Sequence, residues 1–428
     1  MKRLAVLLLA LCLLGGSAQA QGLRVLGMSL SGGPYQEAYP EYQVEEIPID
    51  FDEMGRFHTQ RFLLDNPQGW DVACIWSNEC DLDALAEAGL LMDLSGDSTL
   101  AQWAADLHAP IRRAVSRDDQ VLAVPTFLFG AVMQMTMVTA TQPRQGNKDL
   151  LGPLGLTQAD APTTFEELCA MAQRYAALPK EIRKGRTFQY DSTTGNPKAY
   201  FLAYLIELYT AQYSDKQGHV VYDTPTFRQA LADLEKMAAA LQKDPKLSYS
   251  GKEPIYPLFA DGGPCVLPTM DNQHFLYLGV GDNRNIPARL EMLVVNPHTQ
   301  SKAEAIDFVS RSIRNAEAQA GPMLLERFDY DALARRSYDE NIEAQIYQKE
   351  AQAVIDGLIR ERDSGEYPRY YSREAIQRYA QNVVPFLTFP RIPRVDRYAL
   401  AEEYVRGRLD GEGLMEALGS EAERYWGE

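Results

Sequence analysis

Short apolar stretches that alternate with amphipathic helical stretches constrain the fold of this chain most strongly. Leu23 to Leu30 and Trp70 to Trp76 have the composition of buried strands, and Val44 to Phe51 alternates like a half-buried one. Met54 to Leu64 and Leu82 to Ala86 instead carry apolar residues at helical spacing. Strand, helix, strand and helix at this spacing predict an α/β fold with a mostly parallel sheet.

Capping residues mark several helix starts. Asn78 is expected to cap the helix near Leu82, and Thr164 with Glu167 forms a capping box. Thr224 precedes a proline at a first helical turn, where the missing N–H is harmless. The chain from about residue 343 onward is helical by periodicity, with helices expected over 346–359, 398–409 and 414–426.

The first 20 residues have the three parts of a secretory signal. Lys2 and Arg3 precede an apolar run from Leu4 to Leu14, and small residues follow up to Ala20. The run is shorter than the roughly 20 apolar residues that a transmembrane helix needs. We therefore expect a signal peptide over residues 1–20 and an exported, soluble protein, periplasmic or extracellular. Cys12 is followed by leucine inside the run, so no clear lipidation box is present.

Composition and charge exclude several classes of protein. Hydrophobic residues make up 46% and charged residues 24%, which excludes a disordered chain. The formal net charge of −17 disfavours binding to nucleic acid, whose phosphates such a surface repels. A length of 428 residues without a low-complexity linker favours two closely joined domains.

Four cysteines remain after the signal: Cys74, Cys80, Cys169 and Cys265. Cys74 and Cys80 are the candidate disulfide in an oxidising compartment. The alternative is that Cys74, within an apolar strand, is a small buried hydrophobic residue. The five histidines form no zinc-binding pattern, so we expect neither a metal nor another cofactor.

Motifs for catalysis are missing. Neither a G-x-S-x-G nucleophile turn nor a G-x-x-x-x-G-K phosphate loop occurs. Gly279-Val280-Gly281 begins like a dinucleotide motif, but Arg284 replaces its third glycine. No catalytic residues are expected, and an exported chain of this kind favours binding over catalysis.

Five segments follow the pattern of one protein family in that family's order. They lie at residues 70–72 with 85–94, 121–125, 162–168, 259–265 and 301–309. Phe165 stands where tryptophan is commoner, and Pro264 with Cys265 departs from the pattern. Together the segments resemble the extracellular solute-binding proteins of ABC importers, in particular the carbohydrate-type family 1.

This resemblance implies a periplasmic-binding-protein-like fold, with two α/β lobes facing each other across a ligand cleft. Lobe I is expected over 21–125 plus about 293–345, and lobe II over 126–292 plus about 346–428, with Pro125 and Thr126 at the hinge. The expected partners are a small solute, a sugar or oligosaccharide, and the permease subunits of the transporter. The protein is expected to be a monomer.

Candidate ligand-binding residues follow the strands, because ligands of open α/β sheets lie at the carboxyl ends of strands. Aromatic faces suit the C–H side of a sugar, and polar groups suit its hydroxyls. The candidates are Tyr35, Trp76, Ser77, Phe127, Tyr190, Asp191, Met270 and Asp271. Packing in the core or hinge is the alternative for Trp76 and Phe127, as are an Asx turn for Asp191 and a helix cap for Asp271.

Two other functions remain open from the sequence. A secreted carbohydrate-active hydrolase would release products from oligosaccharides. A binding protein that serves a sensor would bind the same class of solute without a transporter.

Overall fold

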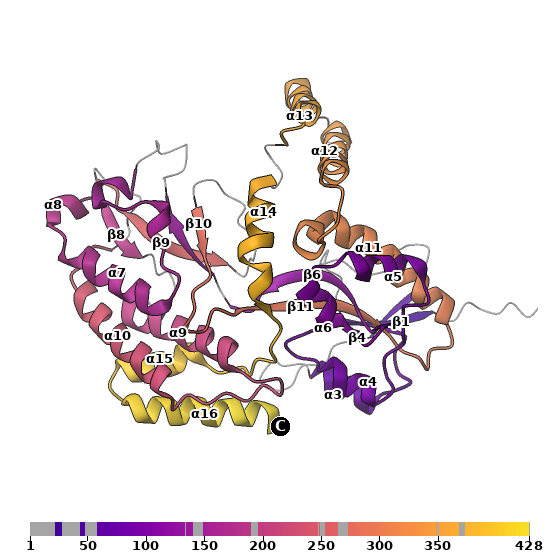
Figure 1. The fold of residues 1–428 in the computed structure, drawn as a ribbon, viewed down its shortest axis with the longest axis horizontal. Coiled ribbons are helices and arrows are strands. Elements are labelled where there is room, and N and C mark those ends of the chain that lie inside the picture. Colours follow the sequence, from indigo (N-terminus) through magenta and orange to yellow (C-terminus); the bar gives the residue numbers. More distant parts are fainter. Residues whose placement is uncertain are drawn as a thin grey trace, which may run out of the picture.

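Two sheets, each with its own hydrophobic core, divide the chain into two lobes (Figure 1). The computed structural model describes residues 22–27, 43–47, 58–132, 134–139, 149–189, 196–246, 248, 253–263, 273–347, 349, 351–367 and 373–427. The signal segment therefore lies outside the described residues. The alternation of strands and helices confirms the predicted α/β class. The predicted mostly parallel sheet is wrong, because both sheets are mixed and antiparallel pairings are as frequent in them as parallel ones.

Lobe I is built on a six-stranded sheet of order β12-β11-β3-β1-β2, with β6 also paired to β11. β1 runs parallel to β2 and β3, whereas β11 runs antiparallel to β3 and β6. The strands are β1 Leu23–Leu26, β2 Val44–Ile47, β3 Val72–Trp76, β6 Val124–Gly130, β11 Ile286–Val295 and β12 Leu387–Thr388. The helices of this lobe are α3 Thr59–Asp65, α4 Leu82–Glu87, α5 Ser98–Asp106, α6 Ala109–Val115, α11 Lys302–Leu324 and α14 Arg373–Asn382.

Lobe II is built on a four-stranded sheet of order β10-β7-β9-β8. Its strands are β7 Gln134–Val138, β8 Arg186–Gln189, β9 Tyr256–Gly263 and β10 Gln273–Leu276. Its helices are α7 Phe165–Ala177, α8 Lys180–Arg183, α9 Pro197–Tyr213, α10 Pro225–Leu241, α15 Arg397–Val405 and α16 Gly411–Gly427. α9 is buried nearly all round, because its sequence is apolar on every face and α10 and α15 cover it.

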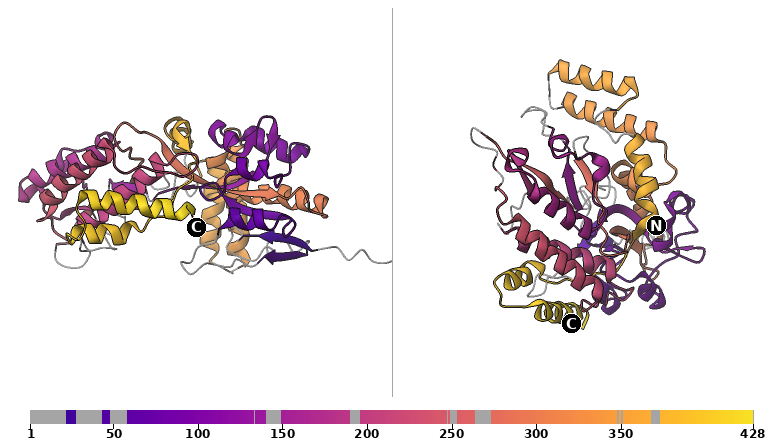
Figure 2. Two further views of the ribbon diagram at one scale, coloured as in Figure 1. Left: turned by 90° about the horizontal axis from the view of Figure 1, so that it is seen from below. Right: turned by 60° about the vertical axis from the view of Figure 1, so that its left-hand side comes forward.

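The chain passes between the lobes three times within its described part. It crosses from β6 to β7, from β10 to β11, and from β12 to α15. The lobe I core draws on residues 23–128, 286–325 and 379–387, and the lobe II core on residues 132–280 and 400–422. Since β6 and β11 carry the chain toward and from lobe II, their ladder lies at the junction of the lobes (Figures 1 and 2).

The prediction of one continuous helix over 346–359 is wrong, because a turn interrupts the helix within this range. α12 (Tyr330–Tyr347) and α13 (Gln352–Ser364) are separate helices, and Lys349 between them has a left-handed φ of 58°. Tyr338, Ile342 and Leu358 contribute to a small core between the two helices. The pair forms a helical arm, residues 330–367, that projects away from both sheets (Figures 1 and 2).

Local capping follows the sequence with two differences. The Thr164 hydroxyl accepts from the Glu167 N–H at 3.0 Å as predicted, but the Glu167 carboxylate reaches back to the backbone and hydroxyl of Thr163, each at 2.8 Å. The cap of α4 is Asp81 instead of Asn78. Its side chain accepts from two N–H groups of the first turn, which favours aspartate at this place.

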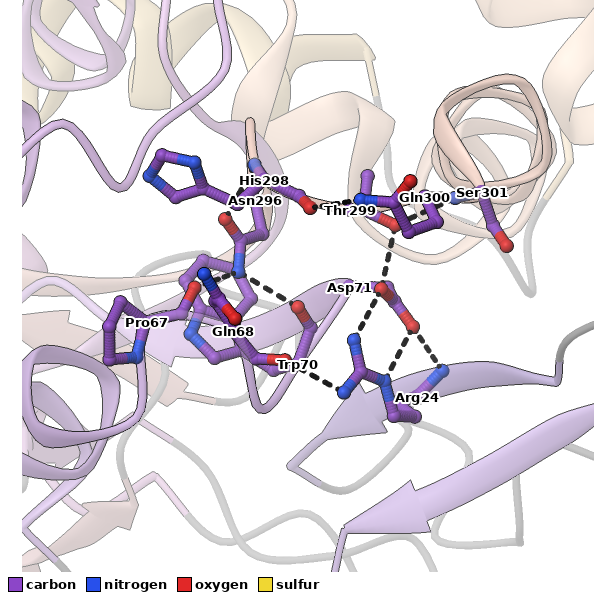
Figure 3. A network of polar contacts seen from close by, with 10 residues as sticks. All are labelled: Arg24, Pro67, Gln68, Trp70, Asp71, Asn296, His298, Thr299, Gln300 and Ser301. Carbon is purple, nitrogen blue, oxygen red and sulfur yellow. Dashed lines mark hydrogen bonds and ion pairs between the residues drawn. The ribbon is translucent and has the colours of Figure 1, made fainter.

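A buried ion pair fixes the start of the lobe I sheet (Figure 3). The Asp71 carboxylate accepts from the Arg24 backbone N–H at 2.8 Å, the Arg24 guanidinium at 2.9 and 3.1 Å, and the Thr299 hydroxyl at 2.6 Å. The Asn296 amide donates to the Trp70 carbonyl at 2.8 Å. These bonds join β1, the start of β3 and the end of β11, and so they hold the three strands in register.

No helix in the described part combines the length and the apolar character that crossing a bilayer requires.

Candidate functional site

One face of the β3–β11–β6 ladder gathers aromatic and charged side chains at the junction of the lobes. Glu291 lies opposite both Trp76 and Phe127, and Arg289 lies opposite Phe129. Directly opposed residues of an antiparallel pair project from the same side of the sheet. We call these five residues the junction face. Four of them are half-buried, and Glu291 is buried.

The aromatic rings of the junction face hold the Arg289 side chain between them. The guanidinium carbon lies 4.9 Å from the centroid of the Trp76 ring and 5.3 Å from that of Phe129. The two rings are themselves 5.4 Å apart, and Phe127 packs 4.4 Å from Phe129. The negative faces of the rings attract the guanidinium and restrict its orientation.

Glu291 is the buried acid of the junction face. The Thr126 hydroxyl donates to its carboxylate at 3.1 Å, and the Cys74 thiol hydrogen-bonds the same group. Burial raises the pKa of Glu291 to about 7, although hydrogen bonds from Cys74 and Thr126 and the charge of Arg289 lower it. The carboxyl is therefore neutral in about half of the molecules at neutral pH.

A turn after β3 borders the junction face. The Ser77 N–H donates to the Leu290 carbonyl at 3.0 Å, and the Leu290 N–H donates to the Ser77 hydroxyl at 2.9 Å. Ser77 thus continues the β3–β11 pairing beyond Trp76. Burial raises the pKa of Glu79 in the same turn, while the nearby cations Arg289 and Arg394 oppose that rise.

The structure brings together only part of the predicted site. Trp76 and Phe127 share the junction face, and Ser77 lies beside it. Pro125 and Thr126, predicted as the hinge, are buried within β6 before the chain leaves lobe I. The binding role of every candidate stays a prediction. Outside the described residues lie Tyr35, Tyr190, Asp191, Met270 and Asp271.

The candidate disulfide is not formed in the structure. Cys74 and Cys80 are both buried thiols, which agrees with the alternative of buried hydrophobic residues. The Cys74 thiol is engaged with Glu291, and burial raises the pKa of Cys80 far above its ordinary value. Cys265 lies outside the described residues. The residues that the structure describes contain no group of side chains that could hold a metal ion.

Arg289 and Glu291 were not predicted as members of the site. Arg289 and Glu291 occupy alternate positions of the otherwise apolar strand Ile286–Val295. Charged side chains on one face of a buried strand are costly without a partner or a role, so this pattern was the available signal.

The chain forms two lobes with separate cores, and three crossovers join them. The junction face, which is aromatic, charged and half-buried, lies beside these crossovers. This is the arrangement of a two-lobed binding protein. The family model of the bacterial extracellular solute-binding protein matches residues 30–310. The chain belongs to this family. This match confirms the family resemblance that the sequence predicted. It also confirms the predicted function, that of an extracytoplasmic solute-binding component.

Solved structures of low sequence identity align along nearly the whole chain. The cyclic alpha-maltosyl-1,6-maltose binding protein of Arthrobacter globiformis is 13% identical, with a TM-score of 0.49 and coverage of 95% of this chain and 99% of that chain. A putative oligosaccharide periplasmic-binding protein from Synechococcus sp. MITs9220 is 16% identical, with the same TM-score and coverage. An ABC transporter solute-binding protein from Thermotoga lettingae, bound with alpha-D-tagatose, is 14% identical, with a TM-score of 0.48 and coverage of 95% and 99%. Among curated proteins, none matches the sequence.

Proposed function

We propose that the two lobes close on a small carbohydrate at the junction face and present it to the permease of an ABC importer. The observation that carries this proposal is the position of the junction face. It lies on β6 and β11, the two strands that lead into and out of lobe II. A solute bound there would contact both lobes. Its affinity would therefore depend on the relative orientation of the two lobes.

A carbohydrate suits the residue types of this face. Trp76 and Phe129 offer apolar ring surface to the C–H groups of a sugar. Arg289 and Glu79 offer hydrogen-bonding groups to its hydroxyls and ring oxygen. Since these side chains come from three segments far apart in sequence, their common location favours a binding role over chance packing.

Closure follows from differential affinity. A solute stabilises the closed form only by the contacts that it gains there, because a ligand with equal affinity for both forms shifts nothing. We place the moving parts at the three crossovers, with lobe I over about 22–130 and 286–387 and lobe II over about 132–280 and 396–427. In this arrangement Pro125 and Thr126 form the fixed lobe I side of the hinge.

Export and delivery complete the proposal. The signal segment is removed after Ala20, and the mature chain acts as a monomer that docks on permease subunits. The chain binds its solute without converting it.

A thermal-shift screen of the mature protein against mono- and oligosaccharides tests this function. At a hundred-fold excess over the dissociation constant, a true ligand adds about 2.7 kcal/mol to the free energy of unfolding. Chromatography of the same mixtures checks for products. A shift without turnover supports the proposal, whereas product formation would establish the hydrolase instead.

A further inference from the structure

The Arg289 guanidinium is held in place by two aromatic rings, and one of its N–H donors has no acceptor in the part of the chain that the structure describes. Its Nε–H is buried and has no hydrogen-bond partner among the described residues. The guanidinium contacts the rings of Trp76 and Phe129, and it attracts the carboxylates of Glu79 and Glu291 over a longer distance. A buried donor without an acceptor costs free energy, so an acceptor supplied from outside would be bound with a gain.

A contrast with the buried Arg186 shows that this chain can satisfy a guanidinium internally. Arg186 is 5% exposed, and its guanidinium donates to four backbone carbonyls at 3.0 to 3.3 Å. Those carbonyls belong to α8 and to the loops around it in lobe II. Arg289 has no comparable set of acceptors among the residues that the structure describes, although its strand β11 is paired on both sides.

The acids near Arg289 neutralise its charge only in part. Glu291 is engaged by Thr126 and Cys74, and its pKa of about 7 leaves it half neutral at pH 7. Burial also raises the pKa of Glu79, which attracts both Arg289 and Arg394. The chain as a whole carries −17, so a cationic position at the lobe junction departs from the rest of the molecule.

We propose that the solute of this site is an acidic sugar whose carboxylate binds Arg289. This inference rests on the proposed function and names its substrate class. A guanidinium presents its donors in a flat fork that matches the two oxygens of a carboxylate, and the rings of Trp76 and Phe129 fix the plane of that fork. A single half-buried arginine suits one negative charge, whereas a phosphoryl group with nearly two charges would call for more cations.

Matched pairs of sugars test the substrate class. Galacturonate and galactose differ only at C6, as do glucuronate and glucose, and oligomers of two and three units extend each pair. Calorimetry on the mature protein at low salt should show the uronate binding about 10- to 100-fold more tightly than its neutral partner. The preference should shrink as salt rises, because screening weakens the charge contribution.

Variants assign the preference to one side chain. Arg289→Gln should remove the uronate preference, so that a uronate and its neutral partner bind to this variant with affinities within about threefold of each other. Arg289→Lys should restore part of it, because the charge returns without the fork. Arg335→Gln, an exposed arginine of the helical arm, should change neither sugar. Circular dichroism and melting curves confirm that each variant is folded.

Three results would overturn the inference alone. The first is a neutral sugar that binds as tightly as its uronate, and the second is a preference that survives in Arg289→Gln. In both cases the proposed function stands and only the substrate class fails. The third is a sugar phosphate that binds more tightly than any uronate. If no sugar of either kind binds, the inference and the proposed function fail together.

Discussion

The Thr126 hydroxyl donates a hydrogen bond to the Glu291 carboxylate at 3.1 Å, although 165 residues separate the two in the sequence. The same hydroxyl reaches the Glu291 backbone carbonyl at 3.2 Å. Both bonds lie where the β6–β11 register shifts, between Glu291 and Met292. Thr126 thus ties the two strands together at an irregular point of the ladder, beside the crossovers to lobe II.

Glu291 should make the protein less stable as the pH rises. The pKa of Glu291 is about 7 in the folded state, above its ordinary value of 4.5. Between these two pH values the folded state therefore binds more protons than the unfolded state. The free energy of unfolding should therefore fall from about pH 4.5 to pH 7 and level off above. Glu291→Gln should be the more stable form at pH 8 by up to about 3 kcal/mol, since each pKa unit corresponds to about 1.4 kcal/mol.

Urea unfolding at pH 4.5 and pH 8 checks this prediction. Glu416→Gln, at an exposed position on α16, serves as the control and should show no such pH-dependent difference. A Glu291→Gln variant that is equally destabilised at both values would contradict the role assigned to burial.

Asp71 should have the opposite pH dependence. Burial alone would raise its pKa, but the bonds from Arg24 and Thr299 outweigh burial and hold the pKa below its ordinary value of 3.8. Its stabilisation is therefore present above about pH 4 and is lost as the pH falls further. Asp71→Asn should cost about 2 kcal/mol at pH 7, less than the roughly 3–5 kcal/mol of a fully buried pair, because Arg24 is 35% exposed.

Thermal melts of Asp71→Asn and of Asp65→Asn compare the stabilisation from the Arg24–Asp71 pair with that from an exposed pair, Arg61–Asp65. The Arg61–Asp65 pair is 69% and 67% exposed on its two sides, so its loss should cost less than about 1 kcal/mol. Equal effects of the two substitutions would show that the bonds around Asp71 contribute no special stability.

Trp76 should report and support solute binding. Trp70 and Trp103 are buried, so the half-buried Trp76 is well placed to respond to a ligand at the junction face. Trp76→Ala should weaken binding by about 30-fold, the effect of losing a central aromatic contact of about 2 kcal/mol. Tyr347→Ala, at an 88% exposed ring of the helical arm, should bind normally. Calorimetry and ligand-induced fluorescence changes measure both, and normal binding by Trp76→Ala would remove the junction face from the site.

Local signals predicted much of the fold. The strand before Trp76 and the cap at Thr164 follow from residues within a few positions of each other, and the structure has both. The break at Lys349 was missed because apolar spacing continues across it, and only packing between the two helices of the arm reveals the turn.

The junction face could be predicted only in part, because it too depends on packing between segments that are far apart in the sequence. Trp76 and Phe127 were accessible because each follows or occupies a recognisable strand. Arg289 was not, because its environment is created by strands about 160 and 210 residues earlier in the chain, and no local pattern encodes that pairing.

Small-angle scattering of the mature protein, with and without a saturating solute from the screen, tests the central claim most directly. Closure of two lobes about the three crossovers predicts a smaller radius of gyration in the bound form, and a smaller change in Trp76→Ala at the same solute concentration. A solute that binds tightly while the radius of gyration stays the same would contradict closure on the junction face.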